Sequence, residues 1–264
     1  MQKIVHAKNF EQWSGLTETY HNSRPVPPET IKKIILLWLK REPDVVVDVG
    51  CGTGLSTTVW DGVAKSVIGI EPNDDMRATA EKYTASDSIV YKKAVSNETG
   101  LPSDYADIIT VSQAFHWMDI DSTLDEFYRI LRKGGVLAIY DCELSPIIDW
   151  EIEKAYDELR AKCFDISYSR ENPLVHNDKS SYKTRIRAFG KFRYSREATC
   201  HSVEKCTPQR VANFALTQGG IINDALEIDA TIQKDIDGFS DLVKMRCANE
   251  FDIISSYKMV LAVK

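Results

Sequence analysis

The stretch that decides the fold runs from Val45 to Gly54 and reads VVVDVGCGTG. Its first half is β-branched and apolar apart from Asp48, a composition typical of a strand buried on both faces of a parallel sheet. Gly50, Gly52 and Gly54 follow at alternate positions, where they allow a tight turn and the close approach of a ligand to the backbone. We therefore expect a ligand-binding loop at the carboxyl edge of a parallel sheet.

The spacing of the three glycines narrows the class of loop. The pattern is GxGxG, whereas dinucleotide-binding folds have GxGxxG, and no GK[ST] follows, which excludes a phosphate-binding P-loop. Glu71 stands 17 positions after Gly54, at the end of the next predicted strand. A carboxylate there can accept hydrogen bonds from two ribose hydroxyls. The loop alone is consistent with a simple turn, but the loop and the acid together indicate a ligand with a ribose.

Strand and helix patterns alternate on either side of this stretch. The predicted strands span 44–49, 66–70, 89–93, 106–112 and 136–141, and the predicted helices span 30–41, 55–63, 74–83 and 121–132. This alternation predicts βαβ units and a parallel sheet with right-handed crossovers. The alternation breaks after residue 142. We expect helices at 147–163, 207–216 and 226–236, strands at 191–203 and 251–263, and irregular chain at 164–190.

Composition limits the possible function classes. The 264 residues include 33 Lys and Arg against 39 Asp and Glu, and a net charge of −6 disfavours a nucleic-acid partner. Hydrophobic residues at 43% and charged residues at 27% exclude disorder, collagen and coiled coil. No cysteine pair has CxxC spacing, and no apolar run approaches the ~20 residues that span a membrane. We expect a cytoplasmic protein with no metal, no membrane partner and no signal peptide.

Four motifs resemble those of the class I S-adenosylmethionine-dependent methyltransferases. They are VVVDVGCGTG (45–54), GIEPNDDM (69–76), ADIITVSQAFHWMD (106–119) and LRKGGVLAIYD (131–141). More narrowly, the chain resembles the small-molecule, type 11-like group related to trans-aconitate methyltransferase. The residues that carry this likeness are a QAxHW segment at 113–117 and a Tyr-x-x-x-Arg-Pro element at 20–25. The resemblance covers about residues 10–142.

The resemblance implies a fold and a cofactor. The fold is a Rossmann-like α/β domain with a seven-stranded, mostly parallel sheet and helices on both faces. We expect residues 1–264 to form one such domain, with residues 143–191 inserted after the fifth strand as a cap over the acceptor site. The cofactor is S-adenosylmethionine and the partner is a small-molecule acceptor. The chain is expected to be a monomer or a homodimer.

The resemblance also implies roles for individual residues. The three glycines pack against the methionine part of the cofactor, Glu71 holds the ribose, and Arg24 and Tyr20 close over the carboxylate end. Residues 94–102 depart from the usual GxAExLP pattern and carry extra residues. The full set of expected cofactor-binding residues is Tyr20, Arg24, Asp48, Gly50, Cys51, Gly52, Gly54, Glu71, Pro72, Met76, Val95, Ser96, Gln113 and Ala114.

Three features leave alternatives open. His116 is either a general base in the acceptor site or a structural histidine, and Trp117 is either packing or a wall of that site. A basic run in and beside the cap either faces solvent or recruits an anionic acceptor; it consists of Lys183, Arg185, Arg187, Lys191 and Arg193. A carboxylic acid, giving a methyl ester, is the expected acceptor. The alternative function is a catalytically silent module that binds the cofactor and regulates a partner.

Overall fold

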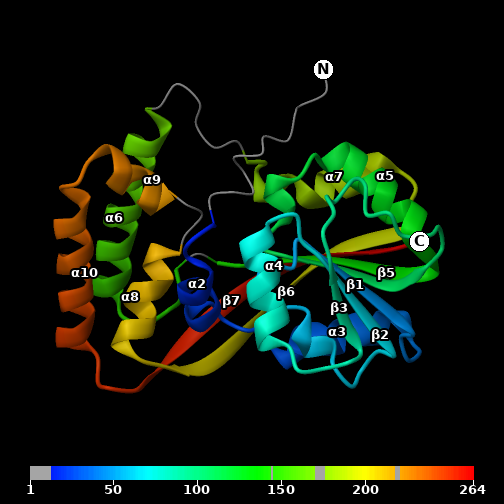
Figure 1. Cartoon of the computed structure of the whole chain (residues 1–264), viewed down its shortest axis with the longest axis horizontal. Coiled ribbons are helices and arrows are strands. Elements are labelled where there is room, and N and C mark those ends of the chain that lie inside the picture. The colour runs from blue at the N-terminus through cyan, green and yellow to red at the C-terminus, as the bar shows by residue number, and fades with distance from the viewer. Residues whose placement is uncertain (1–12, 144, 170–175, 218–220) are drawn as a thin grey trace.

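The computed structural model describes residues 13–143, 145–169, 176–217 and 221–264. Its centre is a seven-stranded sheet with the order β3-β2-β1-β4-β5-β7-β6 (Figure 1). Strands β1 to β5 pair in parallel, and β7 pairs antiparallel to β5 and β6. This confirms the predicted mostly parallel, seven-stranded sheet. The strands are β1 (Val45–Val49), β2 (Ser66–Ile70), β3 (Ile89–Lys92), β4 (Ala106–Ser112), β5 (Leu131–Cys142), β6 (Tyr194–Cys206) and β7 (Phe251–Val263).

Helices cover both faces of the sheet. One face packs against α3 (Glu29–Leu39) through Ile31, Ile35 and Leu39. The other packs against α5 (Ile120–Ile130) and α7 (Tyr182–Phe189), which lie next to each other above the strands in Figure 1. All five residues of β1 are buried, because this strand lies inside the sheet between β2 and β4 and is covered on both faces.

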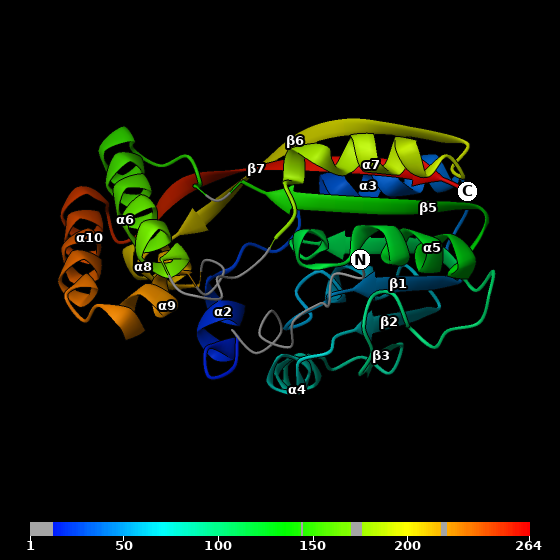
Figure 2. The ribbon, with the colours of Figure 1, turned by 90° about the horizontal axis from the view of Figure 1, so that it is seen from above.

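A second core lies at the far end of the long antiparallel strands. Helices α6 (Trp150–Tyr168), α8 (Pro208–Leu216), α9 (Ile221–Ile228) and α10 (Ile232–Arg246) pack together there, with Cys206 of β6 and Ile253 of β7 among their buried neighbours (Figures 1 and 2). We call α6, α8, α9 and α10 the helical lobe. Helix α2 (Thr17–Ser23) lies between the helical lobe and α4 (Asp74–Tyr83), and contacts α8 on one side and α4 on the other.

The structure corrects the predicted secondary structure in three places. Residues 55–63 form only a short 3-10 turn at Thr58–Trp60, because Asp48 binds the hydroxyls of Ser56 and Thr57 and holds this segment in a tight turn. Residues 164–190 are not irregular throughout, since α6 continues to Tyr168 and α7 follows. The predicted helix 226–236 is two helices, with a break at residues 229–231 where the Asp229 side chain accepts a hydrogen bond from the Thr231 N–H.

The segment 143–191 is divided between two regions. Helix α6 belongs to the helical lobe, whereas α7 packs on the sheet beside α5 through Tyr182 and Ile186. The lobe also takes three helices from residues 208–246, far beyond the predicted insertion. A cap role for 143–191 within a single domain stays a prediction.

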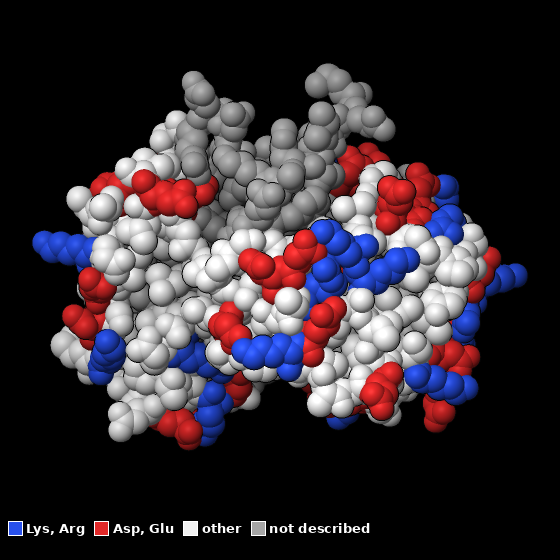
Figure 3. Space-filling model, in the orientation of Figure 1, with Lys and Arg blue, Asp and Glu red and all other residues white. Residues whose placement is uncertain are grey.

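The surface carries both signs of charge. Basic and acidic side chains are interspersed over the face shown in Figure 3, in keeping with the small net charge. No helix within the described ranges is long and apolar enough to cross a membrane. The same ranges hold no group of three or more His, Cys, Asp or Glu residues placed to bind a metal ion.

Candidate cofactor and acceptor site

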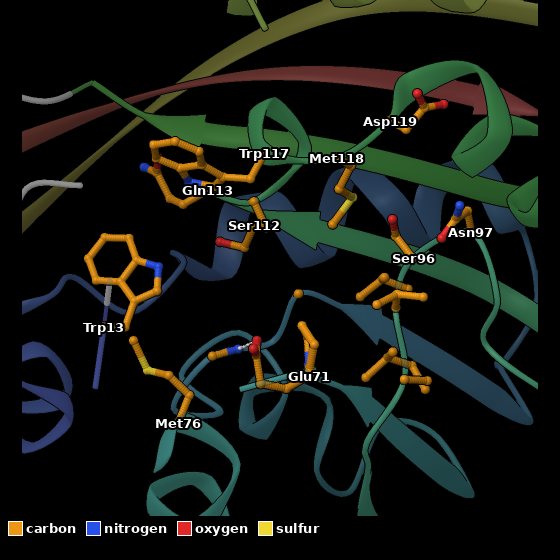
Figure 4. A pocket seen from close by; sticks show the side chains of 18 of the residues that line it. Trp13, Glu71, Met76, Ser96, Asn97, Ser112, Gln113, Trp117, Met118 and Asp119 are labelled. Atoms are coloured by element: carbon orange, nitrogen blue, oxygen red, sulfur yellow. Dashed lines mark hydrogen bonds between the residues drawn. The ribbon is translucent and has the colours of Figure 1, made fainter. Parts of the chain in front are cut away.

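A cavity of about 500 Å³ opens at the carboxyl ends of β1, β2 and β4 (Figure 4). The last residues of these strands, Val49, Ile70 and Ser112, form part of its wall. The loop after each strand adds polar groups and backbone. The cavity therefore stands at the edge of the sheet where the sequence predicted a ligand, and the arrangement follows the general rule for open α/β sheets.

Three acidic residues line this cavity, Glu71, Glu98 and Asp119, and the Glu71 side chain bridges two loops. One carboxylate oxygen accepts a hydrogen bond from the Gly52 N–H at 2.9 Å, and the other accepts one from the Asn73 N–H at 2.9 Å. Burial raises the pKa of Glu71 to about 7, despite the two backbone hydrogen bonds that lower it. Each oxygen has further lone pairs that can accept hydrogen bonds from a ligand.

Gly50 lets the loop pass close to the segment after β4. Its φ is +70°, and a Cβ at this position would lie 2.5 Å from the Cβ of Ala114. Both the backbone conformation and the contact require glycine. At Gly52, where φ is +55°, the nearest atom to an added Cβ would be the Met76 sulfur at 4.0 Å. The loop thus presents bare backbone to the cavity at Gly52.

Most of the predicted cofactor-binding residues line the cavity. Figure 4 shows Glu71 and Met76 on one side and Ser112 and Gln113 opposite. The predicted residues in the wall are Tyr20, Gly50, Gly52, Glu71, Pro72, Met76, Val95, Ser96, Gln113 and Ala114. Ser96 is fixed by a hydroxyl contact of 2.8 Å to Thr123, so the unusual 94–102 segment is held against the start of α5.

Two further predicted residues line a smaller adjoining hollow rather than the main cavity. Arg24 and Cys51 lie there with Tyr20 and Gly52. The Cys51 sulfur packs close to Gly69 of β2, and burial followed by the charges of Glu71 and Asp48 raises the pKa of its thiol well above the usual range. The thiol is therefore uncharged and acts as a small packing group.

Asp48, in β1, and Gly54, the last glycine of the loop, line neither hollow. Asp48 is fully buried and accepts hydrogen bonds from Ser56, Thr57 and Thr110, each at 2.7 Å. A Cβ on Gly54 would lie 2.4 Å from the Tyr91 hydroxyl. The structure therefore gives both residues a role in holding the loop, and their direct contact with the cofactor stays a prediction.

His116 and Trp117 are neighbours in sequence, but only Trp117 lines the cavity. Trp117 lines the cavity together with Trp13 (Figure 4), whereas His116 does not line it and is 9% exposed. The His116 Nδ1 atom lies 3.9 Å from Asp141 and makes no hydrogen bond within the described part of the chain. Burial, followed by the charges of Lys179, His176 and Arg24, lowers the pKa of His116 well below its usual value. The imidazole is therefore neutral at physiological pH and a weak base.

The basic run lies away from the cavity. None of its five residues lines the wall, and three of them form exposed ion pairs: Lys183 with Glu197, Arg185 with Asp121 and Lys191 with Asp125. This arrangement corresponds to the solvent-facing alternative. It gives no support to the other alternative, recruitment of an anionic acceptor at the cavity.

Several site residues were not predicted from the sequence. Trp13 lines the cavity, and its ring meets that of Tyr20 edge-on at 5.2 Å. The Lys179 ammonium group donates hydrogen bonds to the Gln113 side-chain oxygen at 3.1 Å and to the Asp141 carboxylate at 3.0 Å. The Asn177 side chain donates hydrogen bonds to the carbonyls of His116 and Met118, in the loop that carries Trp117. The aromatic-rich N-terminus was the available signal for Trp13. No local pattern marks Asn177 or Lys179.

Comparison with known proteins matches the central part of the chain, which holds most of the parallel strands, to a protein family. Residues 47–139 match the family described as "Methyltransferase domain". Residues 47–139 therefore form an S-adenosylmethionine-dependent methyltransferase domain of the class I fold. A "Putative methyltransferase" of Dictyostelium discoideum is 31% identical over 137 residues, which cover 52% of this chain and 51% of that protein. The malonyl-[acyl-carrier protein] O-methyltransferase of Yersinia pestis is 29% identical over 126 residues, covering 47% and 46%.

The matching segments span about half the length of these relatives. The fold extends further than the sequence likeness. A solved structure of a "Putative Type II Methyltransferase" from Anaeromyxobacter dehalogenans superposes with a TM-score of 0.65 at 18% identity, covering 90% of this chain and 96% of that one. At this identity the likeness establishes the fold alone.

The residues present fit the cofactor of this domain class. The cavity offers Glu71 for ribose hydroxyls and the Gly52 backbone for the methionine part. Two residues of the smaller hollow each carry a buried polar atom, Arg24 Nε and Thr53 Oγ1, and neither atom makes a hydrogen bond within the described residues. Unpaired buried donors are costly, and a carboxylate would satisfy both.

We expect Gly50→Ala to lose both stability and cofactor binding. The control is Gly62→Ala, because Gly62 has a similar φ of +68° but an added Cβ there meets nothing within 4 Å. The control should cost about 1–2 kcal/mol of unfolding free energy, from backbone strain alone. Gly50→Ala should cost more, because the Ala114 segment must also move. Denaturant unfolding and cofactor titration measure both effects, and equal losses in the two variants would contradict the account.

Proposed function

We propose that this protein transfers the methyl group of S-adenosylmethionine to a small-molecule acceptor. The observation that carries the proposal is Glu71, a buried carboxylate at the end of β2 that is bonded to the glycine loop and faces a cavity of about 500 Å³. In this assignment Glu71 accepts hydrogen bonds from the ribose. The loop backbone at Gly52 lies along the methionine part, and Arg24 pairs with its carboxylate.

The chain's contribution to the reaction is alignment and exclusion of water. The bound cofactor supplies a methyl group on a sulfonium. Gln113 lies near the reacting end, and its side chain is fixed by a 2.9 Å bond to the Cys142 carbonyl and by the bond from Lys179. Trp13 and Trp117 line the cavity, and in this assignment their rings help to exclude water. Alignment of this kind can supply roughly 7–11 kcal/mol of the barrier.

The proposed acceptor class is a carboxylic acid, which gives a methyl ester. A carboxylate already carries the attacking electron pair and needs no general base, whereas a phenol or an amine can require one. His116 is a poor base because burial and nearby cations keep it neutral. The Yersinia pestis relative, by its name, methylates an oxygen of a malonyl group. These observations favour O-methylation of an acid.

A methyl-transfer screen tests the proposal. Metabolite acids, phenols and amines are offered with S-adenosylmethionine, and the release of S-adenosylhomocysteine is measured. We expect turnover with acids and a pH-independent kcat between about pH 6 and 8. His116→Gln should keep kcat within about tenfold, since loss of a true general base costs roughly 10²- to 10⁴-fold. Cofactor binding without turnover on any acceptor would instead favour a silent regulatory module.

Cofactor affinity should rise as pH rises through about 7. The pKa of Glu71 is raised to about 7, so below that pH the group is protonated and accepts ribose hydrogen bonds poorly. Above it, the carboxylate accepts them fully. Titrations of wild type and Glu71→Gln between pH 6 and 8 measure the effect, and ionisation of the ligand's own amine affects both proteins alike. An equal slope in the two proteins would exclude Glu71 as the titrating group.

A further inference from the structure

Helix α2 joins the glycine-loop side of the molecule to the helical lobe (Figure 1). On one side, the Thr79 hydroxyl of α4 donates a hydrogen bond to the Thr17 hydroxyl at 2.8 Å, and both hydroxyls are buried. On the other side, α2 packs along α8. The helix carries Tyr20, and Arg24 follows its end, so the two N-terminal residues assigned to the cofactor depend on how α2 is held.

Two arginines fix α2 and α8 to each other in a reciprocal manner. The Arg210 guanidinium of α8 donates hydrogen bonds to the carbonyl oxygens of Ser23 and Arg24, at 3.1 and 3.4 Å. These carbonyls lie at the carboxyl end of α2. Arg24 in turn bonds the carbonyl of Thr217, at the carboxyl end of α8. The last carbonyls of a helix lack partners within the helix and carry partial negative charge, so a guanidinium is well suited to each end.

Arg210 is itself held by the lobe. Its guanidinium forms an ion pair of 2.9 Å with Glu204 of β6, and it also bonds the Lys205 carbonyl at 3.3 Å. The side chain is about one-fifth exposed. Its position is therefore set by β6 and α8 together, and the lobe transmits that position to the backbone at Ser23 and Arg24.

This backbone anchor determines where the Arg24 side chain lies. Its guanidinium sits between the Tyr20 ring at 4.8 Å and the Phe214 ring at 4.9 Å. Its Nε atom is buried and makes no hydrogen bond to any described residue, although it lies beside the hollow that Gly52 also lines. The Nη2 donor of Arg24 is hydrogen-bonded to Thr217 beside the helical lobe, and the Nε donor is left for a ligand.

We propose that Arg210 is a positioning residue for the cofactor, acting through Arg24 and the end of α2. The inference rests on the proposed function, in which Arg24 pairs with the carboxylate of the cofactor's methionine part. The helical lobe, which contributes no described residue to the main cavity, thereby sets affinity for one end of the cofactor. The adenosine end is held by Glu71 and the loop after β3, and does not depend on Arg210.

Two ligands separate the two ends of the cofactor. S-adenosylhomocysteine has both the adenosine and the amino-acid part, and 5′-methylthioadenosine lacks the amino acid. Arg210→Ala should weaken binding of the first by about tenfold and leave the second within about twofold, as expected for loss of one charge-assisted contact. The control is Arg246→Ala, which removes another ion-paired arginine of the lobe, bonded to Asp149, and should change neither.

A double-variant cycle distinguishes positioning from general loosening. With Arg24→Ala already present, Arg210→Ala should cause no further loss of S-adenosylhomocysteine affinity, because its effect passes through Arg24. Additive losses, equal losses for both ligands, or no loss at all would overturn the inference. Each of these results leaves the proposed function standing if the wild type binds both ligands.

Hydrogen exchange tests the anchor without any ligand. The amides of residues 17–24 should exchange faster in Arg210→Ala than in wild type, and at the wild-type rate in Arg246→Ala. Unchanged exchange in Arg210→Ala would overturn the inference even if the wild type bound neither ligand, which is the result that would refute the proposed function. Arg210→Lys keeps one donor and the charge, and should restore part of the protection.

Discussion

The carboxylate of Glu71 is the interaction on which the site depends. It joins the Gly52 N–H in the loop after β1 to the Asn73 N–H in the loop after β2, so one side chain fixes two loops at the same edge of the sheet. A buried carboxylate is costly unless it is well bonded, and its raised pKa shows that two backbone bonds do not fully compensate for burial. Ligand hydroxyls would supply the missing donors.

The loop geometry follows from what lies beneath it. Asp48 takes three hydroxyl donors and turns the chain at residues 55–60, so the glycine backbone is held from below. The chain after β4 approaches Gly50 so closely that only glycine fits. Glu71, Asp48 and the Ala114 segment therefore hold one loop, each through a different contact.

Local patterns in the sequence predicted this part well. Each of the strands β1 to β5, the glycines and Glu71 belongs to a continuous stretch whose periodicity or residue type is readable on its own. The helix predicted at 55–63 was wrong because the Asp48 side chain captures Ser56 and Thr57, a contact that periodicity does not show. The same contact gives Asp48 a role in supporting the loop, beside the cofactor contact that the sequence predicts for it.

The residues that the sequence did not reveal are placed by long-range contacts. Lys179 reaches Gln113 across 66 positions, and Arg210 reaches Ser23 across 187, so neither is marked by its neighbours in sequence. The basic run drew attention because its members are adjacent, yet three of them pair with surface acids away from the cavity. Arg24, which lines the smaller hollow, and Lys179, which contacts Gln113, are set apart from that run in the sequence.

The most direct measurement is a calorimetric titration of S-adenosylhomocysteine into wild type and Glu71→Ala at pH 8, where the carboxylate is charged. The account predicts one saturable site in wild type and a loss of roughly 1.5–3 kcal/mol in the variant, as expected when hydrogen bonds to a charged group are removed. Equal affinities in the two proteins, or no binding to wild type, would contradict it.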